Sequence, residues 1–402
     1  MFSIFEAMTD PKSPSGNTGC RHFPRCGGCS FLAHTYVEEC YRKESRVRDL
    51  LSPLGCRVER IVSSPRQDDW RHKVQLPFGR IKSGRGHLPT IGCYALGSHD
   101  VVDQKECRIQ DRSLSQIAWA VRDWAGREGI PVYNERTGSG FLRHLLLRKA
   151  QATGEILMGL VCNGPRPTHY RALLKTLLPA CEKALRGTDG KLVGVVQDVN
   201  ERDTNVVLGG QELPWWGRNW IKEKLGPYSF HVELSTFFQV NPYQTPRLYD
   251  LAKAAVPKGS KALDAYCGMG TIALWISDKA GQVLGLEENP RSVQGARAAA
   301  KANNVDNVDF VCGDAAELMP ELAHQGWDVV VLDPPRKGLD ERTLASLIES
   351  KIGRIVYVSC NPNSLARDME LLHETYKPLY ATPVDMFPRT EHVETVAVFE
   401  RR

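Results

Sequence analysis

The 402-residue sequence has no apolar run long enough to cross a membrane, and its first residues, MFSIFEAMTD, lack the basic start and apolar core of a secretory signal. It also lacks the Gly-x-Gly-x-x-Gly loop that cradles a dinucleotide pyrophosphate. These absences disfavour a membrane protein, an exported protein and a dehydrogenase. With 42% hydrophobic and 25% charged residues, the composition is that of a folded globular protein, which we expect in the cytoplasm.

Cysteine is plentiful, with twelve residues and no export signal, which favours metal binding or catalysis over disulfides. Cys20, Cys26 and Cys29 lie close together in the run CRHFPRCGGC, where Gly27-Gly28 permit a tight turn. A short glycine-containing loop has little core in which to bury three thiols, so we interpret them as metal ligands.

Zinc and iron–sulfur sites both normally take four ligands, so a fourth must come from elsewhere. Cys107, after an expected strand at 100–103, is the best candidate, whereas Cys56 and Cys93 stay possible. Cys40 suits the role less well, because residues 36–51 predict a charged helix. The spacing alone does not choose zinc or a cluster.

The segment 57–85 is strongly basic and is broken by glycine and proline into short expected strands of a small antiparallel sheet. Trp70 and Phe78 lie among its cations, as an RNA-binding face would need, although an ordinary solvated surface explains the charge equally well. A second basic run, 143–149 in FLRHLLLRKA, predicts a strand with one wet face.

Apolar spacing predicts helices over 114–128 and 169–185, and the segment 192–207 predicts a hairpin. With the basic segment, these elements indicate a smaller α+β region. We expect a mobile lead-in at 1–19, this region at 20–230 and a second domain at 231–402.

The carboxyl-terminal part alternates strand and helix regularly. Asp264, Glu287, Asp314 and Asp333 each end or follow a short apolar run, which predicts a parallel doubly wound sheet with its site at the strand ends. Glu287 comes 23 residues after Asp264, close to the spacing of a ribose-binding acid in nucleotide folds.

Gly268 and Gly270, in DAYCGMGT, would let the backbone approach a ligand closely. No phosphate cradle accompanies them. S-adenosylmethionine carries ribose hydroxyls but no phosphate, so the pattern favours a methyltransferase over an NAD enzyme.

The run RIVYVSCNP places Cys360 at the end of an expected buried strand, and Asn361-Pro362 end that strand. Such a thiol lies where open α/β sheets bind ligands. It is either a nucleophile or a small core residue, the usual state of a free cysteine.

Seven segments together resemble the family of RNA 5-methyluridine methyltransferases: CRHFPRCGGC, WRHKVQL, FFQVNP, DAYCGMGT, LDPPRKGL, VSCNP and FPRTEHVETV. The likeness is greatest to the iron–sulfur branch acting on 23S ribosomal RNA, in its short type without a TRAM domain, because only 19 residues precede Cys20. Two positions differ from the family pattern, which commonly has Asn at His72 and Pro at Arg108.

The resemblance implies a Rossmann-like, S-adenosylmethionine-dependent methyltransferase domain preceded by a smaller α+β iron–sulfur and RNA-binding region. It implies Cys360 as the nucleophile that adds to uracil C6 and Glu394 as the base that removes the C5 proton. The implied cofactor residues are Gln239, Tyr266, Thr271, Glu287 and Asp333. The implied ligands of a [4Fe-4S] cluster are Cys20, Cys26, Cys29 and Cys107.

The expected partner is 23S rRNA, with tRNA as the alternative, and the expected state is a monomer. Phe237 is expected to stack on the target base. A different class of function, a non-catalytic RNA-binding protein with a structural metal, would predict loss of the thiol, the base or the glycine turn. Cys360, Glu394 and Gly268 are all present, so we favour an enzyme.

Overall fold

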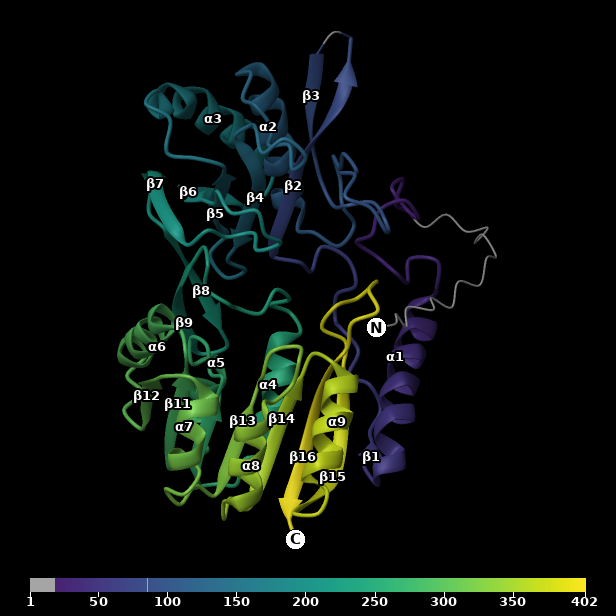
Figure 1. The fold of residues 1–402 in the computed structure, drawn as a ribbon, viewed down its shortest axis with the longest axis vertical. Helices are drawn as coiled ribbons and strands as arrows, with labels where there is room; N and C mark the ends of the chain where they lie inside the picture. Colours follow the sequence, from purple (N-terminus) through teal and green to yellow (C-terminus); the bar gives the residue numbers. More distant parts are fainter. Residues whose placement is uncertain (1–18, 85) are drawn as a thin grey trace.

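The computed structural model describes residues 19–84 and 86–402, so nearly all of the expected lead-in lies outside the described residues. Figure 1 shows two lobes, each built around a sheet, with the β8–β9 hairpin (Trp220–Leu225 and Tyr228–Glu233) between them. None of the described helices combines the length and the apolar character that a membrane crossing needs.

The lower lobe holds an eight-stranded sheet in the order β1-β15-β16-β14-β13-β10-β11-β12. Five neighbouring strands, which reach one edge of the sheet, are parallel, as the apolar runs predicted. They are β10 (Lys261–Ala265), β11 (Gln282–Glu287), β12 (Val308–Cys312), β13 (Val329–Leu332) and β14 (Arg354–Ser359). β16 (Glu394–Arg401) lies antiparallel between β14 and β15 (Tyr376–Val384). The sheet is therefore doubly wound, with its strand order reversing between β10 and β13.

Helices cover both faces of this sheet, and each face has its own apolar core. One core contains α4 (Thr245–Ala255), α5 (Thr271–Ile276) and α6 (Pro290–Ala302). The other contains α1 (Tyr36–Leu51), α7 (Ala315–Leu322), α8 (Glu341–Glu349) and α9 (Pro362–Leu372).

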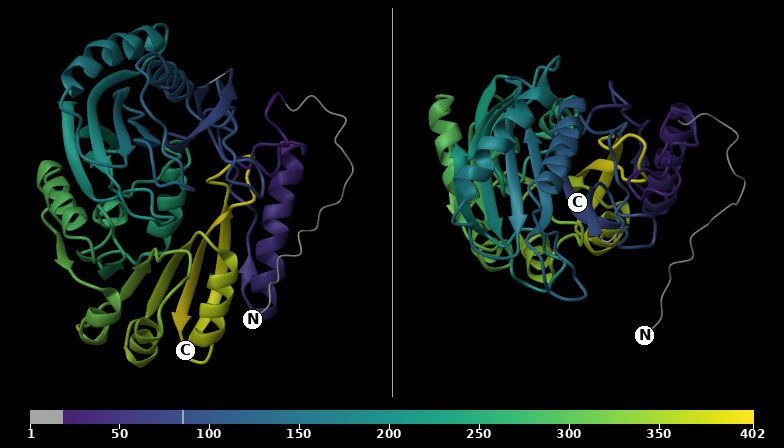
Figure 2. Two further views of the ribbon diagram at one scale, coloured as in Figure 1. Left: turned by 45° about the horizontal axis from the view of Figure 1, so that its top comes forward. Right: turned by 90° about the horizontal axis from the view of Figure 1, so that it is seen from above.

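The amino-terminal part of the chain contributes directly to the lower lobe. α1 is the predicted charged helix, and after the short 3-10 turn Ser52–Leu54 the strand β1 (Arg57–Val58) pairs with β15. Figures 1 and 2 show α1 beside the carboxyl-terminal strands. The domain division near residue 231 stays a prediction, and any division must allow for this return of the chain.

The upper lobe has a six-stranded sheet in the order β3-β2-β4-β5-β6-β7. Its strands are β2 (Lys73–Ser83), β3 (Gly86–Ile91), β4 (Leu142–Lys149), β5 (Glu155–Cys162), β6 (Lys191–Val199) and β7 (Gln211–Gly217). The helices α2 (Arg112–Arg127) and α3 (Tyr170–Leu185) match the two predicted helices and share an apolar core with this sheet.

The predicted hairpin over 192–207 is wrong, because β6 pairs instead with the later strand β7. Residues 200–210 form the connecting loop. The Asn200 side chain donates to the carbonyls of Val206 and Val207, and the Asp198 carboxylate accepts from the backbone of Gly209 and Gly210. These polar contacts hold the segment as a loop rather than a strand.

Two expectations about the basic segments are also wrong. β4 has no wet face, because it is a central strand with a core on each side; Leu146 belongs to one core and Leu147 to the other. Trp70 and Phe78 are buried, at 0% and 6% exposure, so neither can stack on a base.

A buried ion network fixes α1 to the lower lobe. The Nζ atom of Lys43 lies 2.8 Å from Glu39 Oε1 and 2.7 Å from Asp385 Oδ1, and all three side chains are at most 1% exposed. Lys43 also donates to the carbonyl of Phe387, and Glu39 accepts from the backbone N–H of Arg389. The network therefore positions the segment after β15 as well as the helix.

Replacing Lys43 with Met would leave Glu39 and Asp385 buried without their cation. We expect a loss of about 3–5 kcal/mol in the free energy of unfolding, measured by urea denaturation. The control is Lys253→Met, which breaks the exposed pair with Asp278 and should cost under about 1 kcal/mol. Equal small losses in both variants would contradict a structural role for the network.

Candidate active site

A cavity of about 680 Å³ opens at the carboxyl ends of the parallel strands. Its lining comes from the segments after β10, β11, β12, β13 and β14, together with the start of β16 and residues 235–240. Six of the seven residues expected for catalysis and cofactor binding line it: Gln239, Tyr266, Glu287, Asp333, Cys360 and Glu394. Thr271 is not among the lining residues, and its Oγ1 lies 3.0 Å from the hydroxyl of Tyr249.

The pairing of β14 with β16 brings the proposed nucleophile and base to the same end of the sheet. Ser359 pairs with Thr395 in this antiparallel ladder, so Cys360 and Glu394 are the next residues outward on their strands. Cys360 is half-buried, and Glu394 is only 4% exposed.

The cavity concentrates acidic groups where water is scarce. Burial raises the pKa of Asp333 to about 7, and burial together with the nearby Asp333 raises the pKa of Glu394 to about 8. Burial is the main cause that raises the pKa of Cys360 to about 11, and the nearby carboxylates of Glu394 and Asp333 add to the shift. Without a ligand, Cys360 is therefore a protonated thiol.

Arg336 is the cation that opposes these shifts, favouring the ionised forms of both Cys360 and Glu394. It lies exposed on the cavity wall after β13. We assigned it no role from the sequence, although its place in LDPPRKGL, three residues beyond the acid that follows the strand, was a usable signal.

Glu287 is held where a ribose acid is expected. Its carboxylate accepts from the backbone N–H of Gly268 at 3.0 Å and of Asn289 at 2.9 Å. Gly268 and Tyr266 both adopt positive φ, +55° and +65°, which turns the chain sharply after β10. Each carboxylate oxygen of Glu287 accepts one hydrogen bond from the backbone and has a second lone pair free for another donor. Glu287 can therefore also accept hydrogen bonds from ribose hydroxyls.

Three further residues line the cavity. The hydroxyl of Tyr266 donates to Asp340 Oδ2, 3.4 Å distant, and both residues line the cavity. Asp314 caps α7 by accepting from the backbone N–H of Ala316, and it also lines the cavity. Phe237 is 64% exposed, so its ring is available to a ligand.

A second cavity, of about 650 Å³, brings the predicted metal ligands together. Five thiols line it, those of Cys20, Cys26, Cys29, Cys93 and Cys107. Cys40 and Cys56 are not among its lining residues. Of the alternatives that the sequence left open for a fourth ligand, only Cys107 and Cys93 therefore remain near the other three.

Cys26 is held by several hydrogen bonds. Its sulfur accepts from Gln104 Nε2 at 2.9 Å and from the backbone N–H of Gly28 at 3.3 Å. A hydrogen bond with Cys93 lowers the pKa of Cys26 and raises that of Cys93, whereas burial and the neighbouring thiolates raise the pKa of Cys29. Within residues 19–84 and 86–402, no three His, Cys, Asp or Glu side chains are arranged to hold a single metal ion.

Arg71 lies on the wall that the two cavities share. It lines both of them, and its Nε donates to the carbonyl of Lys73 at 3.2 Å. Arg71 therefore connects the two cavities spatially.

The raised pKa of Glu394 gives a prediction about stability. The folded chain binds its proton more tightly than the unfolded chain, so this group's contribution is fully present below pH 4.5 and is lost as the pH rises to about 8. Glu394→Gln removes the ionisation and should make the protein more stable at pH 8 but not at pH 4.5, as measured by thermal unfolding at both values. The control Glu349→Gln, at the end of α8, should change neither. A Glu394→Gln protein that is less stable at pH 8 would contradict this.

Comparison with known proteins adds to this geometry. The family model described as tRNA (Uracil-5-)-methyltransferase matches residues 223–402. An uncharacterized RNA methyltransferase of Leptospira interrogans is 43% identical over 391 residues, which cover 96% of this chain and 100% of that protein. Another, from Clostridium tetani, is 38% identical over 96% of this chain and 83% of its own length.

Among solved structures, the chain is similar to the tRNA (uracil-54, C5)-methyltransferase of Pyrococcus abyssi in complex with S-adenosyl-L-homocysteine. The TM-score is 0.75 at 28% identity, covering 94% of this chain and 86% of that one. The strand-end cavity, the family match and these relatives agree, and the chain belongs to the RNA uracil-5-methyltransferase family, whose reaction uses S-adenosylmethionine.

Proposed function

We propose that this enzyme methylates C5 of a uridine in 23S rRNA through a covalent bond between Cys360 and uracil C6. The observation that carries the proposal is the meeting of Cys360, Glu394 and Asp333 in one cavity with Glu287. Each comes from a different strand end, so the sheet assembles a nucleophile, a base and a ribose acid around one space.

Uracil C5 is too weak a nucleophile to take a methyl group unaided. Addition of the Cys360 thiolate to C6 makes an enolate and places electron density on C5. S-adenosylmethionine, when bound, would supply an electrophilic methyl group: C5 would bond to that carbon as the carbon–sulfur bond of the sulfonium breaks, and S-adenosylhomocysteine would leave. Glu394 then removes the C5 proton, the electron pair re-forms the C5–C6 double bond, and the Cys360 thiolate leaves.

The electrostatics of the free cavity support this order of events. With pKa values of about 11 for Cys360 and about 8 for Glu394, both groups are mainly protonated before ligands bind. A positively charged sulfonium in the cavity would favour the ionised form of each, as Arg336 already does. Deprotonation would thus be easier when the methyl donor is in place.

Phe237 suits the target base. It is exposed at the cavity, where its ring can stack on a base that has left its own stack. Unstacking costs a few kcal/mol and least in a loop, so a loop uridine is the favoured target. Gln239 also lines the cavity, and its amide offers a donor and an acceptor to the polar groups of the cofactor.

The proposed 23S substrate rests on the cysteine set, which resembles that of the ribosomal branch. tRNA is the second candidate, because the similar Pyrococcus protein acts on a tRNA uracil. The proposal places the enzyme in the cytoplasm with its RNA, and a monomer is its expected state.

We also propose that Cys20, Cys26, Cys29 and Cys107 hold a [4Fe-4S] cluster. The donor set fits, because four thiolates are the usual ligands of such a cluster and all four line one cavity. The corners of a four-iron cube hold thiolates farther apart than a single ion does, so the lack of a single-ion arrangement in the described chain is compatible with it. The transfer needs no electron, and a closed site of this kind would shape the RNA-binding lobe.

Methyl transfer tests the mechanism directly. The substrates are 23S rRNA and bulk tRNA from cells lacking the protein, with labelled S-adenosylmethionine and no oxygen. Cys360→Ala should form no 5-methyluridine, whereas Cys40→Ala, on α1 outside both cavities, should keep full activity. Label in tRNA alone would move the substrate to the second candidate, and label in neither would overturn the function.

Trapping the covalent protein–RNA adduct distinguishes the proposed role of Glu394 from that of Cys360. Glu394→Gln should slow turnover by roughly 10²–10⁴-fold, because the C5 proton then has no base. It should also accumulate a protein–RNA adduct that survives denaturing electrophoresis and that Cys360→Ala cannot form. Full turnover by Glu394→Gln would assign the base to another residue.

The metal proposal is tested on protein purified without oxygen. Iron and sulfide should be present at about four each per chain, with broad visible absorption, and zinc should be absent. Cys107→Ser should lose the iron and weaken RNA binding, whereas Cys93→Ser should keep both. Iron loss from Cys93→Ser but not from Cys107→Ser would make Cys93, rather than Cys107, the fourth ligand of the cluster. Intact folding and RNA affinity after cluster loss would contradict a structural role.

A further inference from the structure

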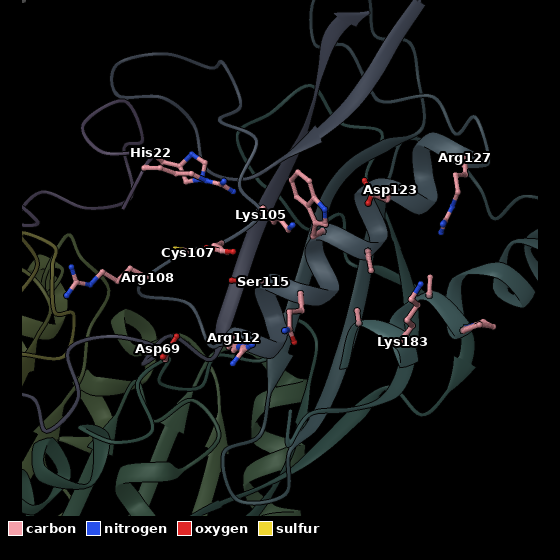
Figure 3. A pocket seen from close by; sticks show the side chains of 18 of the residues that line it. His22, Asp69, Lys105, Cys107, Arg108, Arg112, Ser115, Asp123, Arg127 and Lys183 are labelled. Atoms are coloured by element: carbon pink, nitrogen blue, oxygen red, sulfur yellow. The ribbon is translucent and has the colours of Figure 1, made fainter. Parts of the chain in front are cut away.

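A large groove lies beyond the cysteine cavity, on the side away from the active site. Its volume is about 1230 Å³, and it shares no lining residue with the active-site cavity. One wall is the face of α2 and α3, and the other is the cysteine loop with residues 105–108 (Figure 3). Cys20 and Cys107 line both this groove and the cysteine cavity.

Helical spacing explains why α2 presents a polar face here. Arg112, Ser115, Trp119, Asp123 and Arg127 recur every three or four residues along α2 and all line the groove. The opposite face of the same helix is buried in the upper core. From α3, Lys175 and Lys183 reach the groove two turns apart.

The groove has more free cations than free acids. Six of its cations are in none of the ion pairs found across the described chain: Arg21, Lys105, Arg112, Arg127, Lys175 and Lys183. Two of its four acids are already engaged, because Asp123 pairs with Arg122 and Asp69 faces Arg66. A surplus of exposed cations in a concave surface attracts a polyanion.

Trp119 supplies the accessible aromatic ring that the buried Trp70 and Phe78 cannot offer to a base. Trp119 is half-exposed on the groove, and the guanidinium of Arg122 lies 4.5 Å from its ring centroid. This contact holds the ring while leaving part of it accessible. Cations for phosphates together with an aromatic platform are the combination that binds single-stranded nucleic acid.

We propose that this groove, lined by α2, α3 and the cysteine loop, binds a single-stranded segment of the substrate RNA at a distance from the target uridine. The inference rests on the proposed function, because it assigns a second contact with the same RNA. The site selects RNA by a phosphate chain and a stacked base rather than by the uracil itself. Loss of the cysteine loop's shape would open one wall and weaken this contact.

The groove makes a distinct kinetic prediction, since it does not touch the reacting atoms. Lys175→Glu with Lys183→Glu should raise the KM for RNA roughly tenfold at 0.1 M salt. The kcat and the affinity for S-adenosylmethionine should stay within twofold. The salt slope of log Kd should fall by about 1–2, because two phosphate contacts are lost.

The probes are fluorescein-labelled fragments of 23S rRNA and bulk tRNA, followed by anisotropy at several salt concentrations. The matched control reverses the same charges at Lys258 and Lys301, which are exposed on the lower lobe near the amino ends of its strands. It should leave the salt slope and KM unchanged. Arg112→Gln with Arg127→Gln provides a second groove variant, on α2, should the lysine variant fold poorly.

The results of these experiments show whether the groove proposal or the proposed function has failed. Groove variants with unchanged KM and slope, in a protein that still transfers methyl groups, would overturn the groove and leave the function standing. An equal loss in the control would also overturn it, because the effect would then come from net charge alone. Absence of methyl transfer by the unaltered protein would instead overturn the function.

Discussion

The active site depends on the register between β14 and β16. These strands run antiparallel with Ser359 opposite Thr395, and this alignment sets Cys360 and Glu394 together at one edge of the sheet. A slip of one residue would turn the side chains of β16 to the opposite face. Extensive pairing holds the register, because β16 is bonded to β14 on one side and to β15 on the other. Cys360 and Glu394 are therefore brought together by the backbone pairing of their strands.

Ionising the groups at this same edge of the sheet is unfavourable in free energy. Asp333, Glu394 and Cys360 share a poorly solvated cavity, in which Arg336 favours the ionised forms of Glu394 and Cys360. Groups arranged in this way destabilise one another when ionised, and a cationic ligand relieves that cost. A bound cation at this edge would therefore favour ionisation of Glu394 and Cys360.

The cavities and the groove form a connected series through the molecule. Cys20 and Cys107 border both the groove and the cysteine cavity, and Arg71 borders both the cysteine cavity and the active site. The lobes are joined physically as well, because one apolar core runs from Leu146 in the upper sheet through the β8–β9 hairpin to the lower sheet. α1 and the Lys43 network tie the amino-terminal part to the segment that carries Phe387, another residue of the active-site cavity.

The sequence by itself predicted the parallel strands of the lower sheet, from apolar runs that end at Asp264, Glu287 or Asp333, but not the antiparallel strand β16 that carries Glu394. It also identified α1, α2 and α3, whose apolar spacing is local information. Tertiary structure decided what depends on partners distant in the chain. It buried Trp70 and Phe78, paired β6 with β7, faced Thr271 toward Tyr249 and made Arg336 the cation beside the thiol. The burial of a side chain and the charges around it depend on segments that are distant in the chain, so a local sequence pattern does not predict them.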